Sequence, residues 1–198
     1  DNTIDGTSYN DTIYGGFGRD VIDGGKGADI INGGKGDDTI DGGVGEDTII
    51  WNLGDDMDTV TFSDVDHLKF GEGITFEDLT FYAEGNNLRI VVKGDMTQGV
   101  ICRDYFYSNN NKPENIIFAD GSVYSLQQSG LIIHHGDRSE SISGTDYADT
   151  IYGGKGNNTI SGGDGNDIIY GEDGDDTISG GRGTDTIVGG KGNDTIDG

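Results

Sequence analysis

Two stretches of the chain repeat with a period of nine residues, and no other feature restricts the fold as strongly. Four consecutive units run from Gly15 to Ile50, and five run from Gly153 to Asp197. Most units follow the pattern Gly-Gly-x-Gly-x-Asp-x-Ile-x, and degenerate units precede the two blocks at Gly6 and Gly144. Because nine residues cannot bury a hydrophobic face alone, the units must stack on one another.

The composition supports stacking and excludes several classes of protein. The 198 residues include 38 Gly, 37 acidic and 12 basic side chains, which gives a net charge of −25. Such a chain stays disordered unless its carboxylates are neutralised or its units stack. Its acidity argues against nucleic acid or anionic lipid as a partner, and no apolar run is long enough to span a membrane. A single cysteine, Cys102, excludes an internal disulfide.

The residue types divide each unit into a turn and a strand. Glycines at positions one, two and four permit a positive φ and let backbone carbonyls converge. The last three positions form a short strand, in which the isoleucine at position eight points to one face and its neighbours to the other. If successive strands lie on opposite sides of a flat coil, one full coil takes 18 residues. Acidic side chains then align along two edges, one with Asp20, Asp38 and Asp56 and the other with Asp11, Asp29 and Asp47.

These aligned carboxylates indicate a bound cation. Neighbouring strands in a sheet lie about 4.8 Å apart, and like charges at such a distance repel unless a cation lies between them. The available ligands are carboxylate and carbonyl oxygens without His or Cys, which selects a hard cation. The crowded, irregular geometry favours Ca²⁺ over Mg²⁺.

The repeats resemble the RTX calcium-binding nonapeptide family, over both blocks. The resemblance implies a parallel β-roll in which each ion lies between turns n and n+2, held by two position-six side chains and by carbonyls of the glycine-rich turns. The implied pairs are Asp11 with Asp29, Asp29 with Asp47, Asp20 with Asp38, Asp38 with Asp56, Asp149 with Asp167, Asp167 with Asp185, and Asp176 with Asp194. The implied turn glycines are Gly16, Gly18, Gly25, Gly27, Gly34, Gly36, Gly154, Gly156, Gly163, Gly165, Gly181 and Gly183.

Departures from the pattern limit the number of sites. Asn158 occupies a position-six site, and Asn2 and Glu140 occupy terminal ones, so sites that use them should be weaker or absent. The units at Gly6 and Gly144 lack two glycines, and Glu172 replaces another. We expect about seven calcium sites and at most about nine.

Residues 51–136 differ in composition and contain most of the aromatic side chains. Short apolar or alternating runs predict strands at 59–62, 79–81, 88–92, 100–107 and 115–118, with a break at 109–113. Asp120-Gly121 predicts a hairpin turn, and Thr75-x-x-Asp78 predicts a helical turn. This insert resembles the haemolysin-type calcium-binding related domain. The expected fold is therefore all-β, with two parallel β-roll blocks, 1–56 and 137–198, flanking a β-rich insert, 57–136, that has its own aromatic core.

No catalytic motif is found in this sequence. HExxH and GxSxG are absent, and structural roles are expected for His67, His134 and His135. Cys102 should be a half-buried strand residue rather than a reactive thiol, and Trp51 should cap the end of the first roll rather than stack on a ligand. Basic residues at position three should relieve charge rather than bind a partner. Threonines at position seven could form the ladder of an ice-binding roll, but Val21, Ile30 and Ile168 interrupt it.

The expected function is that of a non-catalytic calcium-binding module in a larger secreted bacterial protein, since both ends of the sequence fall inside repeats. The resemblance implies type I secretion from a Gram-negative bacterium, with folding on calcium outside the cell. The expected partners are calcium and flanking domains of the longer chain, whether toxin, adhesin or exoenzyme. Two alternatives stay open. One is an adhesive, receptor- or glycan-binding module that uses the aromatic insert, and the other is an accessory C-terminal module of a secreted hydrolase.

Overall fold

The computed structural model describes residues 1–63, 65–106, 112–126 and 130–198, and its secondary structure is almost entirely β. This confirms the all-β expectation. The chain forms two compact units. Unit 1 comprises Asp1–Leu79 and Asn87–Gln127, and unit 2 comprises Thr80–Asn86 and Gln128–Gly198. Within the described ranges the helical structure is the 3₁₀ turn η1 (Phe76–Asp78), so no helix there is long enough to cross a membrane.

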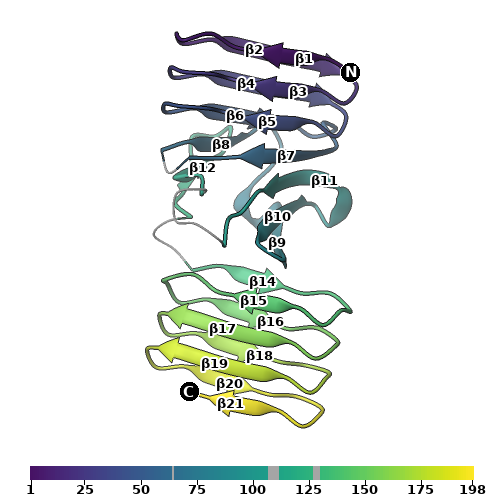
Figure 1. The fold of residues 1–198 in the computed structure, drawn as a ribbon, viewed down its shortest axis with the longest axis vertical. Coiled ribbons are helices and arrows are strands. Elements are labelled where there is room, and N and C mark those ends of the chain that lie inside the picture. Colours follow the sequence, from purple (N-terminus) through teal and green to yellow (C-terminus); the bar gives the residue numbers. More distant parts are fainter. Residues whose placement is uncertain (64, 107–111, 127–129) are drawn as a thin grey trace. The chain divides into compact units, whose positions relative to one another are not determined.

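In unit 1, strands stack alternately on two faces (Figure 1). One face contains, in spatial order, β1 (Thr3–Asp5), β3 (Val21–Asp23), β5 (Thr39–Asp41), β7 (Met57–Thr61), β11 (Asp95–Cys102) and β10 (Asn87–Val92). The other contains β2 (Thr12–Phe17), β4 (Ile30–Lys35), β6 (Thr48–Trp51), β8 (His67–Phe70), β12 (Asn115–Ile117) and β13 (Val123–Tyr124). Only the hairpins β10–β11 and β12–β13 are antiparallel among these pairs of described strands.

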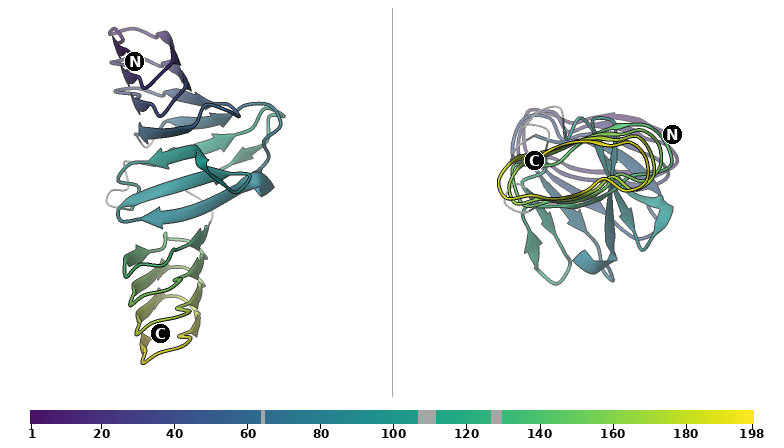
Figure 2. Two further views of the ribbon diagram at one scale, coloured as in Figure 1. Left: turned by 90° about the vertical axis from the view of Figure 1, so that its right-hand side faces the viewer. Right: turned by 90° about the horizontal axis from the view of Figure 1, so that it is seen from below.

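Unit 2 repeats this arrangement. One face contains β9 (Leu79–Glu84), β14 (Ile132–His134), β16 (Thr150–Tyr152), β18 (Ile168–Tyr170) and β20 (Thr186–Val188). The other contains β15 (Ser141–Ser143), β17 (Thr159–Asp164), β19 (Thr177–Arg182) and β21 (Thr195–Asp197). Paired residues are 18 apart, as Ile142 with Ile160, so each coil contains two units. Seen along the stack, the coils of unit 2 are flattened loops that superpose (Figure 2).

The isoleucines at position eight form the core between the two faces. Because side chains alternate along a strand, this position always points inward, and parallel pairing places each isoleucine directly on the next. Buried members are Ile13, Ile22, Ile31, Ile40, Ile49, Ile142, Ile151, Ile160, Ile169 and Ile178. In the last coil, Ile187 is half-buried and Ile196 is exposed.

The insert contains a strand in each of the expected places, and two strands, β8 and β14, that its sequence did not predict. The strand expected over 100–107 is β11, which ends at Cys102, and residues 103–106 form a turn. Tyr107 and most of the predicted break at 109–113 lie outside the described residues. The expected helical turn is η1, where the Thr75 N–H donates to Asp78 Oδ2 at 2.9 Å. Trp51 is buried, with Phe70 packed edge-on at 5.7 Å between ring centres and Phe118 stacked on Phe70. Since β7 and β8 pair with repeat strands β5 and β6, this aromatic cluster continues the isoleucine core of unit 1.

Candidate metal centres in the repeat turns

The glycine-rich turns have the backbone conformation that their sequence requires. All twelve turn glycines expected to contribute carbonyls have a positive φ, between 79° at Gly154 and 142° at Gly183. Side chains other than glycine rarely adopt this conformation. The turns therefore depend on glycine at positions two and four.

One oxygen of each position-six carboxylate joins successive coils. Asp38 Oδ1 accepts the backbone N–H of Asp20 at 2.8 Å, and Asp47 Oδ1 accepts that of Asp29 at 2.8 Å. The same contact recurs 18 residues apart at Asp20, Asp29, Asp149, Asn158, Asp167, Asp176, Asp185 and Asp194. The Oδ1 of Asn158 accepts the same hydrogen bond, from the Glu140 N–H. This contact therefore explains why position six needs a hydrogen-bond acceptor, but it does not explain why most units have a charged aspartate there.

The second carboxylate oxygen lacks a partner in the middle of both blocks. Among the described residues, Oδ2 is buried without a hydrogen-bond donor at Asp20, Asp29, Asp38, Asp47, Asp167 and Asp176. A buried charged oxygen without a partner costs several kcal/mol, so such an atom is rare unless an ion or water is bound.

Asn158 reveals what this second atom faces. Its Nδ2 occupies the corresponding place and donates to the carbonyl oxygens of Gly153 and Gly156, at 3.0 and 3.1 Å. These are the carbonyls of positions one and four in its own turn. In a turn with aspartate, the same point therefore collects two carbonyl oxygens and one carboxylate oxygen without a donor. Such a set of oxygens fits a hard cation.

Position one must be glycine because the carboxylate lies against it. A Cβ placed on Gly15 would lie 2.7 Å from Asp20 Oδ2, and one on Gly171 would lie 2.6 Å from Asp176 Oδ2. The carbonyl of the glycine 18 residues later approaches the same point, as Gly33 O does at Gly15. A side chain at position one would therefore fill the space next to the carboxylate oxygen.

Burial changes the acidity of these carboxyl groups. Desolvation raises the pKa of Asp38, Asp47 and Asp167 to about 6, despite an opposing backbone hydrogen bond at each. Repulsion from neighbouring carboxylates adds to the increase in pKa, from Asp20 at Asp38 for example. A nearby cation would reverse both effects.

The structure corrects the register at the end of the first block. The sequence paired Asp38 with Asp56, but Asp38 N–H donates to Asp58 Oδ1 at 3.0 Å, and Asp47 N–H donates to Asp66 Oδ1. Asp56 instead has a φ of 65° and accepts a hydrogen bond from Gln98. Burial raises the pKa of Asp58 to about 8.

A repeated local spacing could have identified Asp58 and Asp66. In each clean unit the aspartate stands two residues before the inward isoleucine. Asp58-Thr59-Val60 and Asp66-His67-Leu68 keep that spacing, and Val60 and Leu68 stack on Ile40 and Ile49.

Other position-six residues have different surroundings. Thr7 donates to Asp11 Oδ2, and Thr145 donates to Asp149 Oδ2, so these two oxygens are not orphaned. Asp185 and Asp194 are half-buried near the last coil. No cluster of three or more His, Cys, Asp or Glu side chains that could hold a metal occurs among the described residues.

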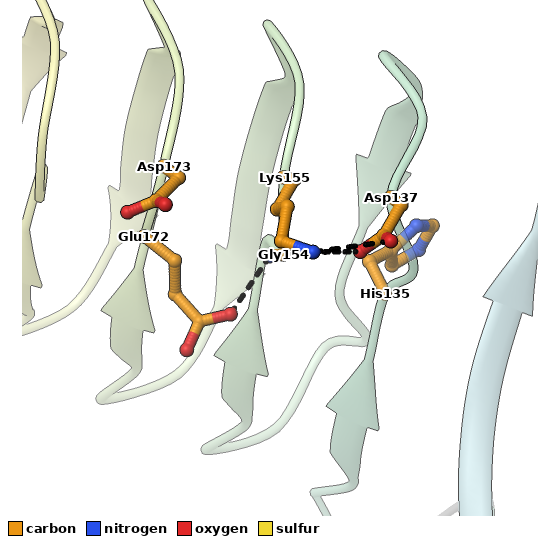
Figure 3. Close-up of a pocket in the computed structure, with 6 residues that line it drawn as sticks. All are labelled: His135, Asp137, Gly154, Lys155, Glu172 and Asp173. Atoms are coloured by element: carbon orange, nitrogen blue, oxygen red, sulfur yellow. Dashed lines mark hydrogen bonds and ion pairs between the residues drawn. The ribbon is translucent and has the colours of Figure 1, made fainter.

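A pocket of about 320 Å³ lies beside the turns at the start of the second block (Figure 3). Figure 3 shows Lys155 directed toward Asp137 and Glu172 directed toward the backbone of Gly154. Glu172 replaces the position-two glycine and has a φ of 73°. The ion pairs of Lys155 with Asp137 and of Lys191 with Asp173 are exposed. They fit the expectation that basic residues at position three relieve the negative charge of the surface.

The remaining candidate groups have structural surroundings. Cys102 is fully buried rather than half-buried, and burial raises the pKa of its thiol. Trp51 is also fully buried and unavailable for stacking on a ligand. His134 stacks on Tyr152, His67 lies near Glu46, and His135 is paired with Glu140.

Comparison with protein families identifies both the repeats and the insert. The model of the RTX calcium-binding nonapeptide repeat (4 copies) matches residues 1–31, 23–58, 136–169, 143–178 and 170–198, more than half of the chain. The model of the haemolysin-type calcium binding protein related domain matches residues 87–128. No curated protein matches the chain.

Among solved structures, the chain is similar to the extracellular lipase LipA from Serratia marcescens. The two are 19% identical with a TM-score of 0.37, and the match covers 96% of this chain. It covers 31% of the lipase, so this chain spans about a third of that protein's length.

Proposed function

Since this chain belongs to the RTX calcium-binding nonapeptide repeat family, we propose that it is a non-catalytic module whose repeat blocks fold when calcium binds in their turns. The observation that carries the proposal is the set of buried, unpartnered Oδ2 atoms in the central turns. Each lies where carbonyl oxygens of its own turn converge, as the hydrogen bonds of Asn158 indicate.

Each proposed ligand set consists of a position-six carboxylate and carbonyls of positions one and four. The first block would use Asp20, Asp29, Asp38 and Asp47, and the second would use Asp167 and Asp176. Bound calcium supplies positive charge to these oxygens and offsets the net charge of −25. The chain's own contribution is to fix the carbonyls through glycines of positive φ and to hold the carboxylate through Oδ1.

Folding would follow from binding. Without calcium, the buried carboxylates must either lose their charge or remain unsatisfied, and the isoleucine core is only one residue wide in each strand. A ligand that binds only the folded state contributes its binding free energy to folding. The boundaries 1–56, 57–136 and 137–198 are proposed to separate the calcium-dependent blocks from the insert.

Calcium titration of the chain, followed by far-UV circular dichroism, tests the proposal. We expect little β-signal from the repeat blocks in EDTA and a cooperative rise on addition of calcium. Magnesium at equal concentration is the control and should produce a much smaller rise. A chain that has its full β-content in excess EDTA would contradict the proposal.

The repeats are typical of secreted bacterial proteins, and we propose that this module belongs to one that leaves the cell by a type I route. A cytosol poor in calcium would keep the repeats unfolded, and the medium would fold them. Fractionation of a producing culture should find the full-length protein outside the cell. The adhesive alternative would have to use the partly exposed aromatic side chains of the insert, Phe76, Tyr82, Phe106 and Tyr124, because Phe62, Phe70, Phe81, Tyr105 and Phe118 are buried.

A further inference from the structure

Three consecutive turns at the start of the second block contain protein donors where the central turns of both blocks have an orphaned oxygen. They belong to units 135–143, 144–152 and 153–161, which we call the basal segment. We propose that the basal segment folds without calcium and that the calcium-dependent units 162–198 then stack on it. This inference rests on the proposed calcium-binding function.

In the first basal unit an imidazole satisfies the position-six carboxylate. His135 stands at position one, where the pattern requires glycine, and Glu140 stands at position six. The His135 Nδ1–H donates to Glu140 Oε2 at 2.5 Å, and the histidine side chain is fully buried. Gly136 and Arg138, at positions two and four of this unit, both lack a positive φ.

In the second basal unit a threonine satisfies the carboxylate. The backbone N–H of Thr145 donates to Asp149 Oδ2 at 2.5 Å, and Thr145 Oγ1 donates to it at 3.0 Å. Both residues are buried. Neither Thr145 nor Tyr147, at positions two and four, has a positive φ, so the turn follows a different backbone path from the glycine turns.

In the third basal unit the backbone conformation is standard, and an amide takes the place of the cation. Gly154 and Gly156 have positive φ, but Asn158 Nδ2 donates to the carbonyls of Gly153 and Gly156. Glu172 supplies the missing carboxylate from the next coil and accepts the Gly154 N–H at 3.0 Å. The two carbonyls that would face an ion are therefore already satisfied.

The change from satisfied to orphaned turns falls between residues 161 and 162. Asp167 and Asp176, in the next two units, have buried Oδ2 atoms without a donor. The first block begins in a similar way, because both the N–H and the hydroxyl of Thr7 donate to Asp11 Oδ2, at 2.6 and 2.8 Å. The sequence Gly-Thr-x-Tyr-x-Asp-Thr-Ile-Tyr thus marks a turn that needs no ion in both blocks.

Hydrogen exchange measured by mass spectrometry, with the 198-residue chain in EDTA and in calcium, tests the inference. In EDTA, amides of 135–161 should exchange at least about tenfold more slowly than those of 162–198, and calcium should remove this difference. If calcium protects neither segment, the proposed function fails. If calcium protects both segments and they exchange equally fast in EDTA, the proposed function stands and this inference is wrong.

A reciprocal pair of variants tests the same point through ion count, measured by native mass spectrometry. Asn158→Asp should create an orphaned oxygen, so the chain should bind one more calcium and lose EDTA protection in 153–161. Asp176→Asn should do the reverse, with at least one ion lost and EDTA protection gained in 171–179. Unchanged ion counts in both variants, with wild-type calcium binding intact, would overturn the inference.

Discussion

At the scale of single residues, the position-six aspartate has two separate tasks. Its Oδ1 receives a backbone N–H from the previous coil, and asparagine performs this task equally well at residue 158. Its Oδ2 lies where carbonyls converge, and there aspartate and asparagine differ completely. An amide donates to those carbonyls, whereas a carboxylate repels them. On the proposed function, the identity of this atom decides whether a turn with the standard glycine backbone requires an ion.

Asp38→Ala and Asp11→Ala should differ strongly in their effect on the calcium midpoint of folding. Asp38 is buried with an orphaned Oδ2, whereas Asp11 is half-buried and its Oδ2 accepts from Thr7. We expect Asp38→Ala to cost about 1–3 kcal/mol and raise the midpoint about tenfold. Asp11→Ala should shift it by no more than about twofold. Equal midpoints in a circular dichroism titration would contradict the assignment of Asp38.

At the scale of elements, the nine-residue pattern correctly predicts the strands, their inward isoleucines and the 18-residue coil. It does so because each property depends on contacts between identical units. The pattern fails where the units cease to be identical. Between β6 and β7 the chain contains two additional residues, so counting by nine leads to Asp56, while packing of Val60 on Ile40 aligns Asp58. Along this stack the aspartate always stands two residues before the buried side chain, whereas the number of residues between successive coils changes.

The turns also show what a sequence pattern leaves out. Thr145 and His135 interrupt the glycine pattern, which predicts weaker sites, but their donation to Asp149 and Glu140 depends on side-chain placement that the pattern does not contain. The continuity of the aromatic cluster with the isoleucine core could not be predicted either. It depends on pairing of β7 with β5, across a change of composition.

Neighbouring residues on β3 provide a test of the stacked core. Ile22 is 1% exposed and Val21 is 52% exposed, since alternate side chains point to opposite faces. In the calcium-loaded chain, Ile22→Ala should lower the free energy of unfolding by about 2–5 kcal/mol. Val21→Ala, the matched control, should lower it by less than about 1 kcal/mol. Urea denaturation measures both, and similar losses would show that the isoleucine ladder is not the core.

At the scale of the whole molecule, two kinds of stabilisation coexist in one chain. The hairpin β10–β11 buries Val91, Val92 and Val100 completely and resembles an ordinary hydrophobic structure. The clean repeats bury one isoleucine for each short strand and place carboxylates beneath the surface. The first kind needs no ion, and the second is proposed to depend on one.

Hydrogen exchange within unit 1 should separate these two kinds of structure. In EDTA, amides of 87–102 should retain protection while those of 15–50 exchange at nearly the rate of an unfolded chain, because only the latter contain orphaned carboxylates. Calcium should slow exchange mainly in 15–50. Equal protection of both segments in EDTA would contradict the division between repeat and insert.

Acid should partly replace calcium in the calcium-free chain. The pKa values of Asp38, Asp47 and Asp167 are raised to about 6 in the folded state, against about 3.9 in an unfolded chain. The folded state therefore binds protons more tightly than the unfolded state. The stability that these groups contribute is fully present below about pH 4 and is lost as the pH rises through about 6.

In EDTA we therefore expect the β-signal in far-UV circular dichroism to increase as the pH falls from 7 to about 5. With calcium present, protons compete with the ion for the same carboxylate oxygens. The calcium concentration at the folding midpoint should therefore rise as the pH falls from 7 to about 5, so that acid opposes calcium-driven folding. The triple variant Asp38→Asn, Asp47→Asn and Asp167→Asn is the control and should show a much smaller change with pH in EDTA. A calcium-free β-signal that stays constant between pH 7 and 5 would mean that these buried carboxylates do not limit folding.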